Sequence, residues 1–159
     1  MFRPGMRAYI VPLVAGAVLT VSAFLPWVVV GKTSMRGAPD VAALWIAGLG
    51  ALAAVLATLS LITRKNSRHP LLLIGLIALG IMFLSWRIMP QSITARALIR
   101  SQALAIVERR AVIDVPSVAV GSGIYAGLAA AIALVGFGLT IVVKRASRPY
   151  VVADPNDDV

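Results

Sequence analysis

Long runs of apolar residues without charge limit what this chain can fold into. Residues 8–30 and 41–63 each contain 23 residues with no charged side chain, and 71–89 and 122–143 are two further apolar runs. An α-helix rises 1.5 Å per residue, so about 20 apolar residues cross the roughly 30 Å hydrocarbon core of a bilayer. Only 13% of the 159 residues are charged, about half the usual share in soluble domains. We therefore predict an all-α integral membrane protein, an up-down bundle of four transmembrane helices, with one domain over residues 1–148.

Polar and helix-breaking residues set the expected ends of these four spans. A signal peptide is the alternative for residues 8–30, but its apolar core would be only about 7–15 residues, and Phe24-Leu25-Pro26-Trp27 is a poor cleavage site. Asp40 is placed to cap the second helix, and Pro90 is expected to end the third.

Residues 90–121 form the longest polar interval, and we expect this segment to lie outside the membrane. Residues 92–112 contain good helix formers without Gly or Pro, which favours a helix. Residues 111–115 favour an extended strand because Pro116 keeps Val115 out of the helical region. We predict that 111–115 pairs with the β-prone residues 28–33 as a small sheet that caps the bundle. The polar end of the chain, residues 149–159, is predicted to be mobile.

Four aromatic residues support the alternating order of the helices. Trp27 is late in the first apolar run and Trp45 early in the second, while Trp86 is late in the third and Tyr125 early in the fourth. In an up-down bundle these positions fall at one face of the membrane. Trp and Tyr prefer that interface because their rings are apolar and their N–H or O–H groups reach water. We therefore predict that all four are interface aromatics.

The basic residues indicate how the bundle is oriented. The formal net charge is +9, and the positive-inside rule gives most weight to Lys and Arg directly beside the spans. This favours an orientation with both termini in the cytoplasm, and we expect the membrane to be a bacterial cytoplasmic (inner) membrane. The inner-surface basic residues are expected to meet anionic lipid head groups; they are Arg64, Lys65, Arg68, Lys144 and Arg145. The chain has no combined aromatic and basic platform, which argues against binding of nucleic acid.

Small residues at four-residue spacing are expected where helices pack closely. Gly50 and Ala54 form one such pair, and Gly123, Gly127 and Ala131 follow one face of the last span. Such faces let helix backbones approach each other in lipid. Packing within the bundle is the expected use, and docking of a second membrane protein is the alternative.

The chain shows no pattern that predicts catalysis, a cofactor or a metal site. It has no cysteine, which excludes disulfides and thiolate ligands. We find no nucleophile with a base and no paired carboxylates, and no span has an ionisable residue near its midpoint, which argues against a pump. Arg87, near the end of the third span, is expected to extend to the interface. The alternative is an ion pair with Asp40, Glu108 or Asp114.

Two short segments carry a resemblance to known proteins. Phe24-Leu25-Pro26-Trp27-Val28 at the end of the first span and Gly121-Ser122-Gly123-Ile124-Tyr125 at the start of the fourth resemble small four-span bacterial membrane proteins whose function is uncharacterised. The plan is also broadly claudin-like. However, the chain lacks the paired cysteines and the Gly-Leu-Trp pattern of claudin first loops, which argues against a barrier or adhesion role. The resemblance implies no catalytic residue.

These observations favour a non-catalytic accessory or scaffold subunit of a larger membrane protein complex, with other integral membrane proteins as partners. The alternative is a small channel or transporter that acts as a homo-oligomer, which would need a lining of Ser and Thr side chains. Span hydroxyls are instead expected to bond to their own helix backbone. The candidates for contact with a partner are the arginines of the polar segment: Arg87, Arg96, Arg100, Arg109 and Arg110.

Overall fold

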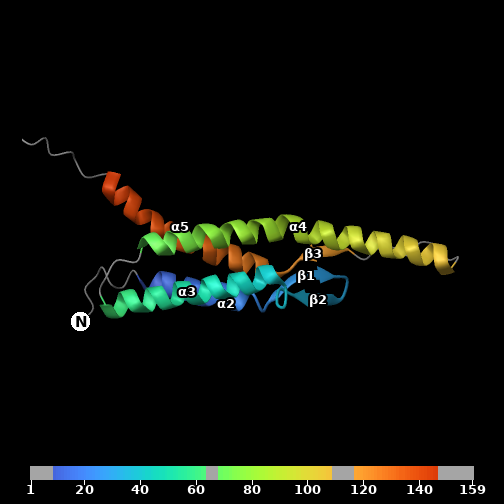
Figure 1. Ribbon diagram of the computed structural model, residues 1–159, viewed down its shortest axis with the longest axis horizontal. Coiled ribbons are helices and arrows are strands. Elements are labelled where there is room, and N and C mark those ends of the chain that lie inside the picture. The colour runs from blue at the N-terminus through green and yellow to red at the C-terminus, as the bar shows by residue number, and fades with distance from the viewer. Residues whose placement is uncertain (1–8, 64–67, 109–116, 147–159) are drawn as a thin grey trace, which may run out of the picture.

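The computed structural model describes residues 9–63, 68–108 and 117–146, which form four helices and a three-stranded sheet. In chain order the elements are α2 (Ile10–Ser22), β1 (Pro26–Val30), β2 (Thr33–Arg36), α3 (Val41–Thr63), α4 (Arg68–Glu108), β3 (Val118–Val120) and α5 (Ser122–Ala146). Figure 1 shows that α2 and α4 run in one direction and α3 and α5 in the other, with the sheet at one end of the bundle. We call this the sheet end.

Three of these helices are long and apolar enough to cross a membrane: Val41–Thr63, His69–Val107 and Ser122–Thr140. The helix α3 has the predicted bounds of the second span, and α5 begins at Ser122 as predicted. The helix α3 starts directly after Asp40, whose carbonyl accepts a hydrogen bond from the Leu44 N–H at 3.1 Å. The length of the uncharged runs therefore predicted the bounds of α3 and the first residue of α5 correctly.

The first span is shorter than predicted. The helix α2 has 13 residues, so it is about 20 Å long, and Pro26–Val30 forms a strand instead of the last helical turns. Val28, Val29 and Val30 are β-branched, which favours strands, and partner strands on both sides of β1 satisfy its backbone groups. The prediction of helix over 8–30 was therefore wrong for its last residues.

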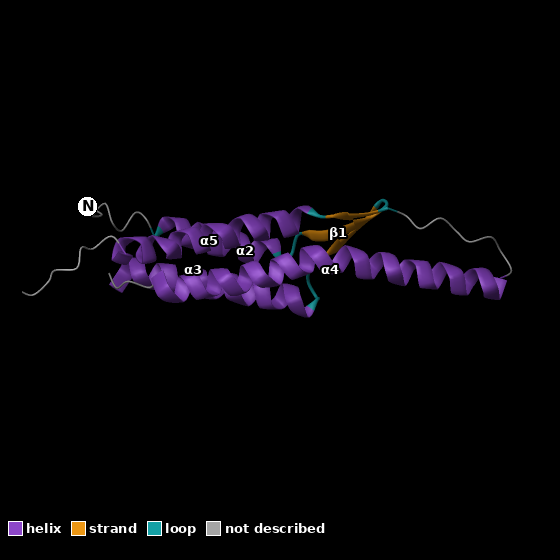
Figure 2. Ribbon diagram, turned by 90° about the horizontal axis from the view of Figure 1, so that it is seen from above, coloured by secondary structure: helices purple, strands orange, loops and turns teal. Residues whose placement is uncertain are grey.

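The prediction that Pro90 ends the third helix was also wrong. The helix α4 continues through Pro90 and has 41 residues, a length of about 62 Å. A proline removes one backbone hydrogen bond from a helix. The hydroxyls of Ser92 and Thr94 donate to the carbonyls of Met89 and Pro90, at 2.9 and 2.8 Å. Good helix formers follow from Ala95 onward, and Figure 2 shows α4 extending well beyond the sheet.

The sheet has the order β2-β1-β3, and both pairings are antiparallel. Gly31 and Lys32 separate β1 from β2, and Gly31 has φ 57°, the left-handed conformation that two-residue hairpin turns require. On its other edge β1 pairs Val28 with Val120 and Val30 with Val118. The predicted small sheet is therefore present, but its described third strand is Val118–Val120. The expected strand 111–115 and the expected mobile tail 149–159 lie outside the described residues.

The helices pack as two close pairs, α2 with α3 and α4 with α5, and α2 also contacts α5. Each helix contributes fully buried side chains to the core, among them Leu19, Ile46, Met82 and Leu134. The outward faces carry large apolar side chains such as Val55, Leu59 and Phe83, which are about half exposed. This pattern, apolar inside and outside, is that of a bundle surrounded by lipid.

Candidate functional site

Trp27 fixes the junction between the sheet and the bundle. Its side chain is only 1% exposed, and its Nε1–H donates to the Ser22 carbonyl at 2.8 Å. Gly37 and Gly123 lie against the indole, because a Cβ on either glycine would stand within 2.7 Å of ring atoms. The prediction that Trp27 is an interface aromatic with its N–H in water was therefore wrong. The bulge in β1 between Pro26 and Val28 directs this side chain into the bundle.

The other three predicted interface aromatics are exposed near the sheet end. Trp45 is 63%, Tyr125 57% and Trp86 37% exposed. Trp45 and Tyr125 lie in the first two turns of α3 and α5, while Trp86 lies one turn before Pro90 in α4. These side chains therefore form a level around the bundle at which one membrane interface is expected.

A cavity of about 400 Å³ lies between the sheet, the connection from β2 to α3 and the part of α4 beyond Pro90. Ligand pockets commonly have volumes of this order. Its apolar lining includes Trp27, Val28, Met35, Met89 and Ile93, and its polar lining includes Arg36, Asp40, Ser92 and Arg96. The Ala38–Pro39 peptide bond beside it is cis. Residues 60 positions apart in the sequence thus meet at the mouth of the bundle.

Of the three predicted arginines that the structure describes, which are Arg87, Arg96 and Arg100, only Arg96 lines this cavity. Arg100 lies one turn further along α4 and Arg87 one turn before Pro90, and both are exposed. Within the described side chains, no ion pair joins Arg87 to Asp40 or engages Arg36, Arg96 or Arg100. The side chain of Glu108 is not described, and Arg109, Arg110 and Asp114 lie outside the described residues.

Sequence reasoning did not select Arg36, Asp40 or Ser92 as site residues. The available signal was Gly31-Lys32 between two β-branched stretches, which is typical of a two-residue hairpin. A hairpin at that position pairs Arg36 with Pro26 and so brings Arg36 close to the end of the bundle. The continuation of α4 through Pro90, which brings Arg96 there, had no comparable signal.

The part of α4 beyond the cavity has few contacts with the rest of the described chain. No side chain from 86 to 107 is fully buried, and Ser85 is the last buried residue of this helix. Three large apolar side chains here are mostly exposed: Ile99 at 66%, Ile106 at 79% and Val107 at 80%. We call residues 97–107 the α4 arm. Figure 2 shows it projecting away from the bundle.

The predicted small residues lie at helix contacts inside the bundle. Gly50 faces Gly16 and Thr20 of α2, and Ala54 lies against Gly16. On α5, Gly123 faces the end of α2 and Gly127 lies against Met82 of α4. Ala131 is fully buried. These residues are therefore used where α2 meets α3 and where α5 meets its two neighbours.

The predicted basic residues at the opposite end are only partly described. Arg68 is the first residue of α4, and Lys144 and Arg145 belong to the last turn of α5, although the side chains of these three are not described. Arg64 and Lys65 lie outside the described residues. Figure 1 places the start of α4 and the end of α5 away from the sheet, so these positions share one end of the bundle.

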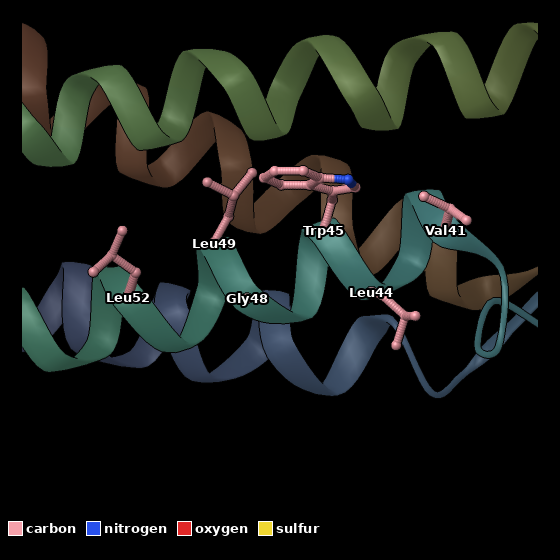
Figure 3. A pocket seen from close by; sticks show the side chains of 6 residues that line it. All are labelled: Val41, Leu44, Trp45, Gly48, Leu49 and Leu52. Atoms are coloured by element: carbon pink, nitrogen blue, oxygen red, sulfur yellow. The ribbon is translucent and has the colours of Figure 1, made fainter.

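A second hollow, of about 420 Å³, lies on the outer face of α3 and is almost entirely apolar. Figure 3 shows Trp45 and Leu49 directed toward one side of it and Leu44 toward the other, with Gly48 between them. No heavy atom lies within 4 Å of the place where a Gly48 Cβ would stand. Apart from the indole N–H of Trp45, the side chains of its described lining are hydrocarbon, so this hollow suits an apolar group.

Comparisons of the chain with protein-family models, with curated proteins and with solved structures found no match. Among the described side chains, no three of the types His, Cys, Asp and Glu lie close enough to hold a metal ion. The candidate sites are therefore defined by geometry alone: the cavity at the sheet end and the α4 arm.

Proposed function

We propose that this protein is a non-catalytic accessory subunit of a larger membrane protein complex, and that the α4 arm contacts its partner. The observation that carries the proposal is the exposure of Ile99, Ile106 and Val107 on a helix that leaves the bundle. An exposed apolar face of this kind is costly in water, and in soluble regions it marks a surface for another protein. We place the arm outside the membrane, because α4 is about twice as long as the hydrocarbon core is thick.

The arrangement of side chains on the arm fits a helix-to-helix contact. Ile99, Ala103 and Ile106 follow each other at four and three residues, so they lie on one face of α4. Arg100 lies on the adjacent face of the arm, and Arg96 lies one turn before it, just outside the arm. Apolar residues flanked by charge are the usual pattern of a helix that packs against another helix. We therefore propose that the partner is an integral membrane protein with an extramembrane helix or groove of acidic and apolar character.

We further propose that the chain crosses a bacterial cytoplasmic membrane four times, with both termini in the cytoplasm. The helix α2 contacts both α3 and α5 and carries no charge, which supports its placement in the same apolar layer as the three long helices. The basic residues opposite the sheet end, including Arg68, Lys144 and Arg145, would then face anionic lipid in the cytoplasmic leaflet.

Cysteine labelling tests this topology cleanly, because the chain has no native cysteine. Single variants Arg3→Cys, Ser34→Cys and Ser67→Cys would be exposed to a membrane-impermeant thiol reagent in intact cells and in inverted vesicles. We expect Ser34→Cys to react in intact cells and the other two only in inverted vesicles. Reaction of positions 3 and 34 from the same side would show that α2 does not cross, and would refute the four-span topology.

The partner proposal is tested by purification in mild detergent followed by mass spectrometry. We expect the wild-type protein to carry a second integral membrane protein at fixed stoichiometry. The double variant Ile99→Ser/Ile106→Ser should lose it, whereas Leu104→Ser, an exposed apolar change on another face of the arm, should keep it. A partner retained by the double variant would refute the role of the arm.

The same preparation separates the subunit from a channel. A wild-type protein that purifies only as a monomer or homo-oligomer, and that passes ions in liposomes, would contradict the subunit proposal. The described span hydroxyls give the channel little support. Thr20, Thr58 and Thr140 each bond to a carbonyl three or four residues earlier in their own helix, so these hydroxyls do not form a free polar lining.

A further inference from the structure

The cavity at the sheet end combines an apolar floor with a charged rim. Trp27 and Val28, which form part of its floor, are each 1% exposed. Arg36 and Arg96, on β2 and α4, carry its two guanidinium groups, and Asp40 carries its carboxylate. A ligand that fills this space must therefore offer both an apolar part and a negative charge.

The position of the cavity along the bundle matches the head-group layer of a membrane. Met89 lies three residues after Trp86 and Ser92 six residues after it, so the cavity lining along α4 begins about 4–5 Å outward of the exposed aromatic level and reaches Ser92 at about 9 Å. Aromatic residues mark the boundary of the hydrocarbon core, and the polar layer beyond it is about 5–8 Å thick on each side. A membrane of ordinary thickness therefore brings phosphate groups to the inner part of this cavity, beside Met89.

The charges of the rim fit a singly charged anion. Two arginines and one aspartate give the ionisable lining a net charge of +1. Among the described side chains, neither arginine is held in an ion pair, so both guanidinium groups have donors available for a ligand. A phosphodiester carries one negative charge, whereas a phosphate monoester near neutral pH carries close to two. Guanidinium groups bind phosphate oxygens through paired N–H donors, and the Ser92 hydroxyl lies in the same lining.

We propose that this cavity binds the phosphodiester head group of a membrane phospholipid. Arg36 and Arg96 hold the phosphate, and the glycerol and the first carbons of the chains lie against Met89, Ile93 and the floor. The binding joins the hairpin to α4 through a lipid. The proposal rests on the membrane position of the sheet end and not on the partner of the α4 arm, so it is tested on the purified protein alone.

The experiment is native mass spectrometry of delipidated protein titrated with phosphatidylglycerol in detergent. The wild type is compared with Arg96→Gln, with Arg36→Gln/Arg96→Gln and with Arg100→Gln. Arg100 is the matched control, because it is an exposed arginine one turn along α4 that does not line the cavity. Diacylglycerol tests the need for the phosphate, and inorganic phosphate as competitor tests the need for the lipid.

We expect one tightly bound phospholipid per wild-type chain and an affinity at least about tenfold lower in the double variant, since each charge-assisted contact is worth about that factor. Arg96→Gln should fall between them, and Arg100→Gln should stay within about twofold of the wild type. Equal affinity in the double variant, or an equal loss in Arg100→Gln, would overturn the proposal. So would diacylglycerol binding as tightly as phosphatidylglycerol, or displacement of the lipid by inorganic phosphate.

Discussion

Gly50 lies where α3 crosses α2, and its replacement by alanine is expected to destabilise the protein by about 2 kcal/mol. A Cβ at this position would stand 2.6 Å from the Thr20 backbone nitrogen and 2.8 Å from the Gly16 carbonyl oxygen, short of the 3.4 Å at which ordinary contact begins. Both neighbours are backbone atoms, so only a separation of the two helices relieves the contact. We therefore take the upper part of the range for extra volume in a packed interior, about 3 kcal/mol. The gain of about 1 kcal/mol from replacing glycine in a helix offsets part of it.

The chain offers a matched control two residues away on the same helix. A Cβ at Gly48 would meet no heavy atom within 4 Å, so Gly48→Ala receives the helix gain alone and should stabilise by about 0.5–1 kcal/mol. Gly16→Ala should behave like Gly50→Ala, because its Cβ would stand 2.7 Å from the Ala54 nitrogen.

The measurement is reversible unfolding of purified protein in mixed micelles, with helical circular dichroism as the signal. We expect the two alanine variants of α3 to shift the midpoint in opposite directions. The double variant Gly16→Ala/Gly50→Ala should lose less than the sum of the single losses, since one separation of the helices relieves both contacts. A Gly50→Ala protein as stable as Gly48→Ala would refute the close crossing of α2 and α3.

Three further variants test other parts of the structure, the first two by the same unfolding assay and the third by amide exchange. Trp27→Phe replaces the buried indole by a smaller phenyl ring and removes the 2.8 Å bond to the Ser22 carbonyl; a loss of about 2–4 kcal/mol is expected from the lost bond and the space left behind, and no loss would contradict both the bond and the tight packing. Ser60→Ala should be neutral or stabilise by up to about 1 kcal/mol, because the buried Ser60 hydroxyl has no hydrogen-bond partner in the described part of the chain; a clear loss would reveal a partner. Ser92→Ala/Thr94→Ala should keep or raise the helix content beyond Pro90, because alanine is the better helix former and hydroxyl bonds to carbonyls of the same helix do not stabilise it; faster amide exchange over 91–107 would contradict this.

Sequence length and charge located α3 and the start of α5 because both helices begin at sharp polar turns. Asp40 and Gly121 interrupt the apolar pattern where the chain reverses. The end of α2 has no such signal. Residues 26–30 are as apolar as the helix before them, and a short apolar run does not distinguish a buried strand from a helix by periodicity. Pairing with β2 and β3, which lie later in the chain, decides between the two.

Trp27 and Pro90 show why the site itself was harder to predict than the spans. A tryptophan near a span end is most often at the interface, but here a bulge and two glycines create an internal place for the ring. Pro90 was expected to end a helix because of its missing N–H. The strong helix formers that follow from Ala95 outweigh that loss. Both outcomes depend on the surroundings of the residue in the fold, which the identity of that one residue does not predict.

Because α4 continues through Pro90, its length also sets how far its tip lies from the bundle. The 18 residues from 91 to 108 form one continuous helical segment about 27 Å long. The first half of α4 is packed in the bundle, which fixes the rotation of this segment about the helix axis. A partner that binds the tip, as proposed above, would therefore be held at a set distance from the membrane surface and at a set angle around the helix axis. Removal of seven residues from this segment would lower the tip by about 10 Å and nearly preserve its facing, whereas removal of five would turn it by about 140°. The length of the helix sets the distance of its tip from the bundle, and the helical phase sets the direction that the tip faces. Deletions of different length can change these two properties separately.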